Sequence, residues 1–120
     1  MPKILIVDDD ADILELVRMT LSMNNFETAA VSRGHDIESS IINFEPDLIL
    51  LDIAIAGADG RVICRHIKSN KETQHIPVLL FSANVETENS FKDCLADGAI
   101  AKPFQLSYLL GTIKKHLTKV

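Results

Sequence analysis

Carboxylate side chains stand directly after two apolar runs in the first half of this chain. Asp52 follows the unbroken aliphatic run at residues 48–51, and Asp8 and Asp9 follow a similar run at residues 4–7. Solid apolar runs of this length are typical of strands buried on both faces of a parallel sheet. Because the ligand crevice of such a sheet lies beyond the carboxyl ends of its strands, we expect these carboxylates to gather at one rim.

A hydroxyl group and an ammonium group take corresponding places later in the chain. Ser82 follows the apolar run at residues 78–81, and Lys102 follows the short run at residues 99–101. Three carboxylates at one buried rim would repel one another unless a cation joined them. Mg²⁺ suits this rim better than Ca²⁺, because it needs few carboxylates, keeps several waters and shares its coordination sphere with phosphate.

Together these groups are the parts required for phosphoryl transfer to a carboxylate. A metal ion and Lys102 would neutralise oxygens of the transferred group, Ser82 would donate to another, and Asp52 would attack in line. Each residue alone has an ordinary explanation, since an acid after a strand or before a helix is commonly a turn or cap residue. Matching chemistry at successive strand ends favours a functional site.

The composition predicts one domain with an aliphatic core. The chain has 120 residues, of which 47% are hydrophobic and only 5% aromatic, and its formal net charge is −5. The acidic balance and the lack of a basic face argue against nucleic acid as a partner. No apolar run reaches the ~20 residues of a membrane span and no signal peptide is evident, so we expect a cytoplasmic protein. We also expect it to be a monomer or a weak dimer. Cys64 and Cys94 lack metal-binding spacing and are expected to be reduced core thiols.

Strand and helix patterns alternate five times along the chain. Strands are expected at residues 4–7, 26–31, 48–51, 78–81 and 99–101. An amphipathic helix is expected after each, including one at residues 86–96. The last helix has the clearest apolar stripe: Leu106, Leu109, Leu110, Ile113 and Leu117. Because β-α-β crossovers are right-handed, we predict an α/β fold in which residues 1–120 form a doubly wound, five-stranded parallel sheet with five helices.

Several side chains indicate where the helices begin and which face they bury. Asp10 is expected to cap the first helix and Ser32 the second. In the third helix, which opens at Gly60, Val62 is expected to face inward, and in the fourth Leu95 is expected to be an apolar anchor. The histidines lack ligand spacing and are expected to be ordinary surface or helix-face residues: His35, His66, His75 and His116.

The chain resembles the receiver domains of two-component response regulators over essentially its whole length. The matching motifs are Ile-Leu-Ile-Val-Asp-Asp-Asp at residues 4–10, Pro-Asp-Leu-Ile-Leu-Leu-Asp at residues 46–52, Pro-Val-Leu-Leu-Phe-Ser-Ala at residues 77–83 and Lys-Pro-Phe at residues 102–104. The resemblance implies a flavodoxin-like sheet with strand order 2-1-3-4-5. It also implies a cis peptide bond between Lys102 and Pro103.

The same resemblance implies a function for the site residues. Asp52 would accept a phosphoryl group from a sensor histidine kinase or a histidine phosphotransfer protein, and Ser82 and Lys102 would hold the phosphoryl oxygens. Mg²⁺ would be bound by Asp8, Asp9, Asp52 and the backbone carbonyl of Ala54. The chain would signal through contacts with an output protein, and it would catalyse only its own phosphorylation and dephosphorylation. It is therefore not expected to be an enzyme that acts on an external substrate.

Three positions depart from the usual pattern of that family. Ile55-Ala56 stands where Met-Pro is usual, so this loop loses a fixed φ and is expected to be more mobile. Leu95-Ala96 stands where Gly-Ala is often found. Ala99 stands where Tyr or Phe is usual, and in the usual scheme that ring turns inward when the hydroxyl corresponding to Ser82 swings toward the phosphoryl group. None of these changes removes a candidate catalytic residue, so they bear on switching.

Other classes of function stay open as alternatives. A receiver-like interaction domain that works without phosphorylation is motivated by the changes at Ala99 and in the Ile55-Ala56 loop. A Mg²⁺-dependent phosphohydrolase would need an acid/base partner two residues after Asp52, where Ala54 cannot serve. A flavin or nucleotide binder would need a glycine-rich loop after the first strand, which is absent. Ala54 and Asn84, two residues beyond Asp52 and Ser82, are expected to influence the lifetime of a phosphoaspartate.

Overall fold

Five parallel strands form the central sheet of the protein. The computed structural model describes residues 1–55, 58–82 and 94–117. The strands of the sheet are β1 (Lys3–Val7), β2 (Glu27–Val31), β3 (Leu48–Asp52), β6 (Val78–Ser82) and β7 (Gly98–Ala101). Their order is β2-β1-β3-β6-β7, with every neighbouring pair parallel. Counted along the chain, this is the predicted order 2-1-3-4-5, which is confirmed.

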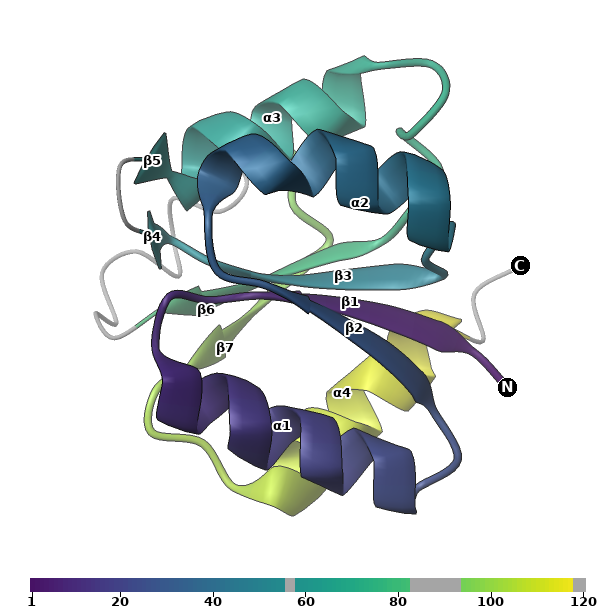
Figure 1. The fold of residues 1–120 in the computed structure, drawn as a ribbon, viewed down its shortest axis with the longest axis vertical. Helices are drawn as coiled ribbons and strands as arrows, with labels where there is room; N and C mark the ends of the chain where they lie inside the picture. Colours follow the sequence, from purple (N-terminus) through teal and green to yellow (C-terminus); the bar gives the residue numbers. More distant parts are fainter. Residues whose placement is uncertain (56–57, 83–93, 118–120) are drawn as a thin grey trace.

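Helices cover both faces of the sheet, as Figure 1 shows. One face carries α1 (Ala11–Met23) and α4 (Leu106–Leu117), and the other carries α2 (Ile37–Phe44), entered through the 3₁₀ turn η1 (Gly34–Asp36), and α3 (Gly60–Ser69). The predicted doubly wound fold is therefore confirmed. The helix predicted at residues 86–96 falls mainly on residues 83–93, which lie outside the described residues. No helix in the described part of the chain is long and apolar enough to cross a membrane.

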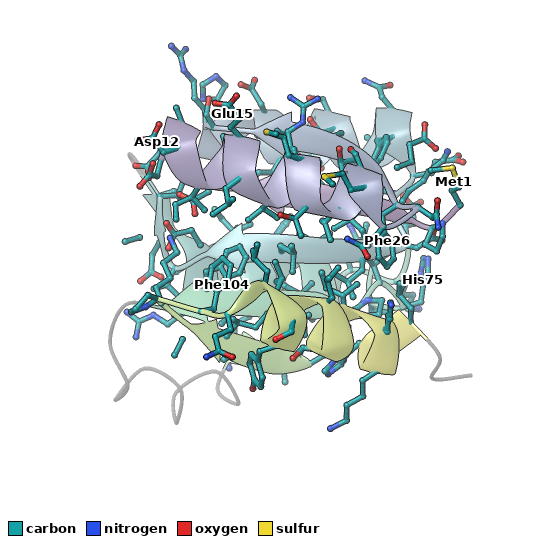
Figure 2. The ribbon with its side chains drawn as sticks, turned by 90° about the horizontal axis from the view of Figure 1, so that it is seen from below. Met1, Asp12, Glu15, Phe26, His75 and Phe104 are labelled. Atoms are coloured by element: carbon teal, nitrogen blue, oxygen red, sulfur yellow. The ribbon has the colours of Figure 1, made fainter. Side chains whose placement is uncertain are left out.

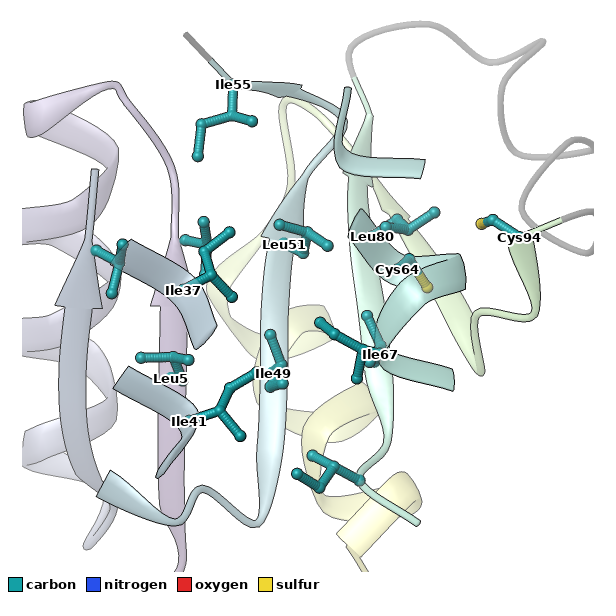
Figure 3. Packing of buried hydrophobic residues seen from close by; sticks show 14 residues of the cluster. Leu5, Ile37, Ile41, Ile49, Leu51, Ile55, Cys64, Ile67, Leu80 and Cys94 are labelled. Carbon is teal, nitrogen blue, oxygen red and sulfur yellow. The ribbon is translucent and has the colours of Figure 1, made fainter. Parts of the chain in front are cut away.

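Successive residues of each central strand point into two different apolar clusters. In β1, Leu5 and Val7 lie in the cluster beneath α2 and α3, part of which Figure 3 shows, whereas Ile4 and Ile6 lie in the cluster beneath α1 and α4. All four side chains are fully buried. A strand covered on both sides has no polar face, which explains the unbroken apolar runs of the sequence. Phe104, labelled beside α4 in Figure 2, is half-buried against the second cluster.

The predicted cap of α1 is confirmed. The Asp10 carboxylate accepts hydrogen bonds from the backbone amides of Asp12 (3.0 Å) and Ile13 (3.3 Å). It thereby satisfies two of the amides that have no partner within the helix. The helix ends at Met23 with Asn24 as its C-cap, and Asn25 follows with a φ of 68°.

Three other predictions about helix residues are wrong. The chain enters α2 through η1 instead of from Ser32, and α2 has no side-chain cap. Val62 is 67% exposed, because α3 buries the face that carries Cys64 and Ile67, and a residue two positions before Cys64 points about 200° away. Leu95 is also exposed, and its φ of 68° directs the chain toward β7.

A short antiparallel hairpin that the sequence did not predict follows β3. Its strands are β4 (Ala54–Ile55) and β5 (Ala58–Asp59), in which Ala54 pairs with Asp59 and Ile55 with Ala58. The Ile55 side chain is buried in the cluster beneath α2 and α3. Isoleucine thus anchors the described part of the loop that was expected to gain mobility.

Candidate functional site

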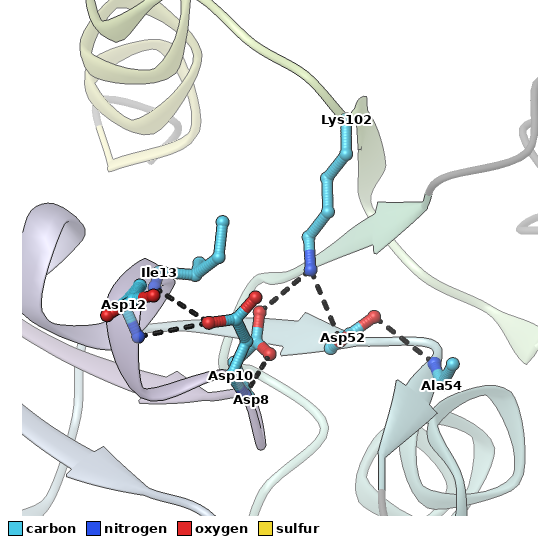
Figure 4. A network of polar contacts seen from close by, with 7 residues as sticks. All are labelled: Asp8, Asp10, Asp12, Ile13, Asp52, Ala54 and Lys102. Carbon is cyan, nitrogen blue, oxygen red and sulfur yellow. Dashed lines mark hydrogen bonds and ion pairs between the residues drawn. The ribbon is translucent and has the colours of Figure 1, made fainter.

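The predicted site residues converge at one edge of the sheet. Asp8 directly follows β1, Asp52 is the last residue of β3, and Lys102 directly follows β7 (Figure 4). Ser82 is the last residue of β6, and its pairing with Ala101 places its backbone at the same edge. Parallel strands present their carboxyl ends together, so the topology itself gathers residues that lie far apart in the sequence.

Lys102 bridges the two buried carboxylates of this edge. Its ammonium nitrogen lies 2.9 Å from Oδ2 of Asp8 and 3.2 Å from Oδ2 of Asp52. Asp8 is fully buried and Asp52 is 7% exposed, whereas the Lys102 side chain is 18% exposed. The same nitrogen lies 5.6 Å from the centroid of the Phe81 ring. One cation therefore partly compensates two carboxylates in a desolvated site.

The charge balance of the site favours a second cation. Burial raises the pKa of Asp52 above its ordinary value, and repulsion from Asp8 raises it further, while Lys102 acts in the opposite direction. Burial acts to lower the pKa of Lys102, but its hydrogen bonds and charge interactions with the two carboxylates outweigh burial, and the net shift is upward. Lys102 is thus held charged, and the carboxylates remain under-compensated.

Three carboxylates are placed to hold a metal ion. Asp8, Asp9 and Asp52 each offer one oxygen atom, and these three atoms lie within 4.8 Å of one another. Asp9 is exposed, so the group opens to water on one side. An all-oxygen set that leaves room for waters fits Mg²⁺. The donor set and the charge deficit therefore both suit the predicted ion.

Backbone hydrogen bonds fix the orientation of the acidic side chains. The Ala54 amide donates to Oδ1 of Asp52 at 3.2 Å, and the Asp10 amide donates to Oδ1 of Asp8 at 2.9 Å. Asp10 itself is engaged as the α1 cap and so belongs to the helix and not to the candidate metal group. The metal-binding role of the Ala54 carbonyl stays a prediction, as does the role of Ser82. Asn84 lies outside the described residues.

Gly60 is a positioning residue that the sequence indicated only as a helix start. Its amide donates to the Ile53 carbonyl at 2.7 Å. A Cβ atom at this position would lie against the Asp52 carbonyl oxygen and 2.8 Å from the Ile53 Cα. Glycine therefore lets the first turn of α3 approach the backbone of Asp52. The Asp-Gly pair at residues 59–60 is the signal for it, but only the fold shows what the glycine approaches.

The Lys102–Pro103 peptide bond is cis, as the resemblance implied. The chain turns there from β7 toward α4. Phe104 follows, and its ring stacks on that of Phe81 with the centroids 5.2 Å apart and the planes 7° apart. Lys102 is thus held between a strand end and an anchored aromatic residue.

Known proteins with similar sequences are response regulators, and a model of their receiver domain matches most of this chain. A family model described as the response regulator receiver domain matches residues 4–114. The DNA-binding dual master transcriptional regulator RpaA of Synechocystis sp. is 31% identical over 121 residues, which cover 99% of this chain and 50% of that protein. The phosphate regulon transcriptional regulatory protein PhoB of Pseudomonas aeruginosa is 33% identical over 118 residues, which cover 97% of this chain and 52% of that protein. The chain thus spans about half the length of these relatives.

Solved structures show the same fold. The BeF₃-activated N-terminal receiver domain of Klebsiella pneumoniae RstA has a TM-score of 0.89 and 27% identity, and the match covers 98% of this chain and 99% of that one. The signal receiver domain of a signal transduction histidine kinase from Syntrophus aciditrophicus has a TM-score of 0.90 and 28% identity, with 98% and 91% covered.

Proposed function

Since this chain belongs to the response regulator receiver domain family, we propose that Asp52 accepts a phosphoryl group from a sensor histidine kinase or a histidine phosphotransfer protein. Residues 1–120 would act as one receiver domain in a two-component phosphorelay. The phosphorylated form would signal through contacts with an output protein. Receiver domains are signalling modules, and the only reactions proposed here are the phosphorylation and dephosphorylation of Asp52 itself.

The observation that carries this proposal is the Lys102 ammonium group between Asp8 and Asp52. In the proposed reaction an Asp52 oxygen attacks the phosphorus atom, the bond from phosphorus to the donor nitrogen breaks, and the donor imidazole leaves. Lys102 would follow the new negative charge onto the phosphoryl oxygens. Ser82, at the end of β6, would donate a hydrogen bond to another of them.

We further propose that Asp8, Asp9, Asp52 and the Ala54 carbonyl hold Mg²⁺ during this reaction. The ion would supply positive charge to the phosphoryl oxygens and relieve repulsion among the carboxylates. Asp8 and Asp9 would then act as ligands, and Asp52 would be both ligand and nucleophile. The cytoplasmic location and the monomeric or weakly dimeric state stay predictions.

Phosphorylation can be tested with a small-molecule donor. The protein is incubated with acetyl phosphate and Mg²⁺ and its intact mass is measured, together with Asp52→Asn and the exposed control Asp36→Asn. We expect a labile phosphoryl adduct on the parent chain and on the control, and none on Asp52→Asn. Absence of an adduct with acetyl phosphate and with phosphorylated donor proteins would instead favour an interaction domain that works without phosphorylation.

The metal site can be tested separately by titration with Mg²⁺. Asp9→Ala should abolish binding, because it removes one of the three carboxylate ligands from a weakly compensated group, whereas Asp12→Ala on the exposed start of α1 should bind as the parent does. A change in NMR amide shifts at residues 8–10 and 52–54 reports binding directly. Parental affinity in Asp9→Ala would contradict the assigned ligands.

A further inference from the structure

Two cysteine thiols meet in the core on the side of the sheet that carries α2 and α3. Cys64 belongs to α3, and Cys94 lies shortly before β7. Their exposed fractions are 0% and 4%, and both belong to the same apolar cluster. Figure 3 shows the two side chains, which come from these separate segments, with their sulfur ends turned toward one another, and the neighbouring Cys94 thiol helps to raise the pKa of Cys64. The two thiols are thus neighbours in one apolar cluster although the residues are far apart in sequence.

We propose that Cys64 and Cys94 form a redox site, in which a peroxide oxidises the dithiol to an intramolecular disulfide and a small thiol reduces it again. Disulfide formation requires that the two side chains approach without a large backbone movement. Two buried thiols that face one another within one cluster meet this requirement better than two thiols brought together by chance opening. The proposed site is separate from the acidic edge of the sheet.

The reaction with hydrogen peroxide balances in two steps. The sulfur of Cys94 attacks one peroxide oxygen, the O–O bond breaks, and a sulfenic acid and one water form. The sulfur of Cys64 then attacks the sulfenic sulfur, the S–O bond breaks, the S–S bond forms and a second water leaves. Overall, two thiols are oxidised to one disulfide and one peroxide is reduced to two waters.

The different exposure of the two thiols indicates which one reacts first with the peroxide. Cys64 has no exposed surface, and burial together with the neighbouring Cys94 thiol raises its pKa far above the ordinary value. Cys64 is therefore the slower nucleophile toward a dissolved oxidant, since the thiolate is the reactive form. Cys94 retains the small exposed fraction of the pair and is the point of first attack. Because both thiols are well covered, oxidation is expected over hours and not seconds.

The disulfide would join two segments that flank the acidic edge. The first residue of α3, Gly60, lies against the backbone of Asp52, and the residues after Cys94 lead directly into β7 and Lys102. A covalent link between α3 and the start of β7 would oppose relative movement of these segments. It would also close a loop in the unfolded chain and so stabilise the folded state.

Intact mass spectrometry of the folded wild-type protein tests the proposal. The reduced protein is treated with hydrogen peroxide in native buffer, trapped with iodoacetamide and digested with trypsin without reduction. We expect the intact chain to lose the mass of two hydrogen atoms, and the peptide containing Cys64 to be linked to that containing Cys94. Dithiothreitol should restore the starting mass. Only oxygen additions, only intermolecular dimers or no change in mass would overturn the proposal.

Single variants identify the role of each thiol. In Cys64→Ala the same treatment should stop at oxygen adducts on Cys94, whereas in Cys94→Ala the buried Cys64 should react severalfold more slowly than either thiol of the parent. Equal rates for the two variants would contradict the assigned order. Circular dichroism shows whether each variant is folded, and the wild-type experiment decides the main proposal if either is not.

A functional consequence rests on the proposed phosphorylation of Asp52. Reduced and oxidised protein are compared with acetyl phosphate and Mg²⁺, and the oxidised form should be phosphorylated severalfold more slowly. Equal rates would exclude this consequence while leaving the disulfide itself established by mass. A lack of phosphorylation in both forms would instead contradict the proposed function.

Discussion

At the scale of single residues, the site combines buried charges that do not fully compensate one another. Asp52 is nearly buried beside Asp8, and its carboxyl pKa is raised first by burial and then by that neighbour. Ionised Asp52 therefore destabilises the metal-free fold at neutral pH. A cation bound as proposed above would relieve this cost in stability.

Asp52→Asn should accordingly stabilise the metal-free protein. The amide keeps an oxygen for the Ala54 amide, removes one buried negative charge and leaves Lys102 paired with Asp8. We expect a gain of about 1 kcal/mol in the free energy of unfolding, measured with urea in the presence of a chelator. Asp36→Asn, at an exposed position, should change stability much less. A destabilised Asp52→Asn would show that the carboxylate is fully compensated without a metal.

Leu95 is a second residue whose side chain does not suit its backbone. Its φ of 68° lies in the left-handed region, which glycine adopts freely and leucine does not, and the residue is about half exposed. Leu95→Gly should stabilise the protein by about 1 kcal/mol, because relief of the left-handed strain exceeds the small loss of contact. Leu95→Ala is the matched control, since it shortens the side chain but keeps the Cβ. A gain in alanine as large as in glycine would assign the effect to the side chain instead.

At the scale of elements, the sequence predicted strands and helices where the apolar pattern spans several residues, and it missed elements that are only two residues long. Unbroken apolar runs identified the central strands, and the resemblance supplied their order. The β4–β5 hairpin has strands of two residues, too short for any periodicity to be seen. The exposed face of α3 was misjudged at Val62, because the sequence does not state which neighbours a helix packs against. The site residues were recognised from types and strand ends, but the contact of Gly60 with Asp52 exists only in three dimensions.

The junction between β3 and α3 should be the most sensitive backbone contact near the site. Gly60→Ala places a methyl group against the carbonyl of Asp52, so the helix start or the strand end must move. Destabilisation of about 1–3 kcal/mol is expected, as for other overpacked positions. Phosphorylation by acetyl phosphate should also slow, since the carboxylate is displaced with its backbone.

Gly111→Ala provides the control for this substitution. Gly111 lies within α4, and an added Cβ meets no atom within 4 Å among the described residues. Alanine there should stabilise the protein by up to about 1 kcal/mol through helix propensity. Both variants are measured by urea unfolding. Similar effects at the two glycines would contradict the close approach at Gly60.

At the scale of the whole molecule, the start of β7 is held from both sides of the sheet. The Asp97 carboxylate accepts hydrogen bonds from Lys68 Nζ of α3 (2.9 Å) and from the backbone amide of Val78 in β6 (2.8 Å). On the α4 side, Nε2 of the buried His116 lies 3.2 Å from the Asp97 carbonyl oxygen, and its Nδ1 lies 2.9 Å from the Thr112 carbonyl oxygen. These contacts join both layers to one strand end, and the sequence signalled none of them because their partners are distant along the chain.

The residue at position 99 of β7 leads to a prediction about how phosphorylation would change the molecule. The family scheme relies on an aromatic ring at the position of Ala99, and alanine has no ring to turn. Ala99 is half-buried against the α2–α3 cluster and pairs in register with Leu80. A ligand shifts an equilibrium only through a difference in its interactions with the two states, so without the ring β7 has little to respond with. Backbone amide shifts should therefore change strongly between Ser82 and Ala96 when Mg²⁺ and beryllofluoride are added, and severalfold less at Gly98–Ala101.

Ala99→Tyr supplies the comparison that makes this prediction decisive. If the missing ring limits the response, tyrosine at this position should enlarge the shift changes of β7 relative to those of the preceding segment. The Asp52→Asn variant, which lacks the proposed acceptor carboxylate, should show neither change and so controls for non-specific effects of the ligand. Should β7 of the parent respond as strongly as residues 82–96, another side chain must take the part of the ring. Phe104, stacked on Phe81 next to Lys102, is the described aromatic residue best placed to do so, because a shift of Lys102 toward a phosphoryl group would pull directly on its neighbours in sequence.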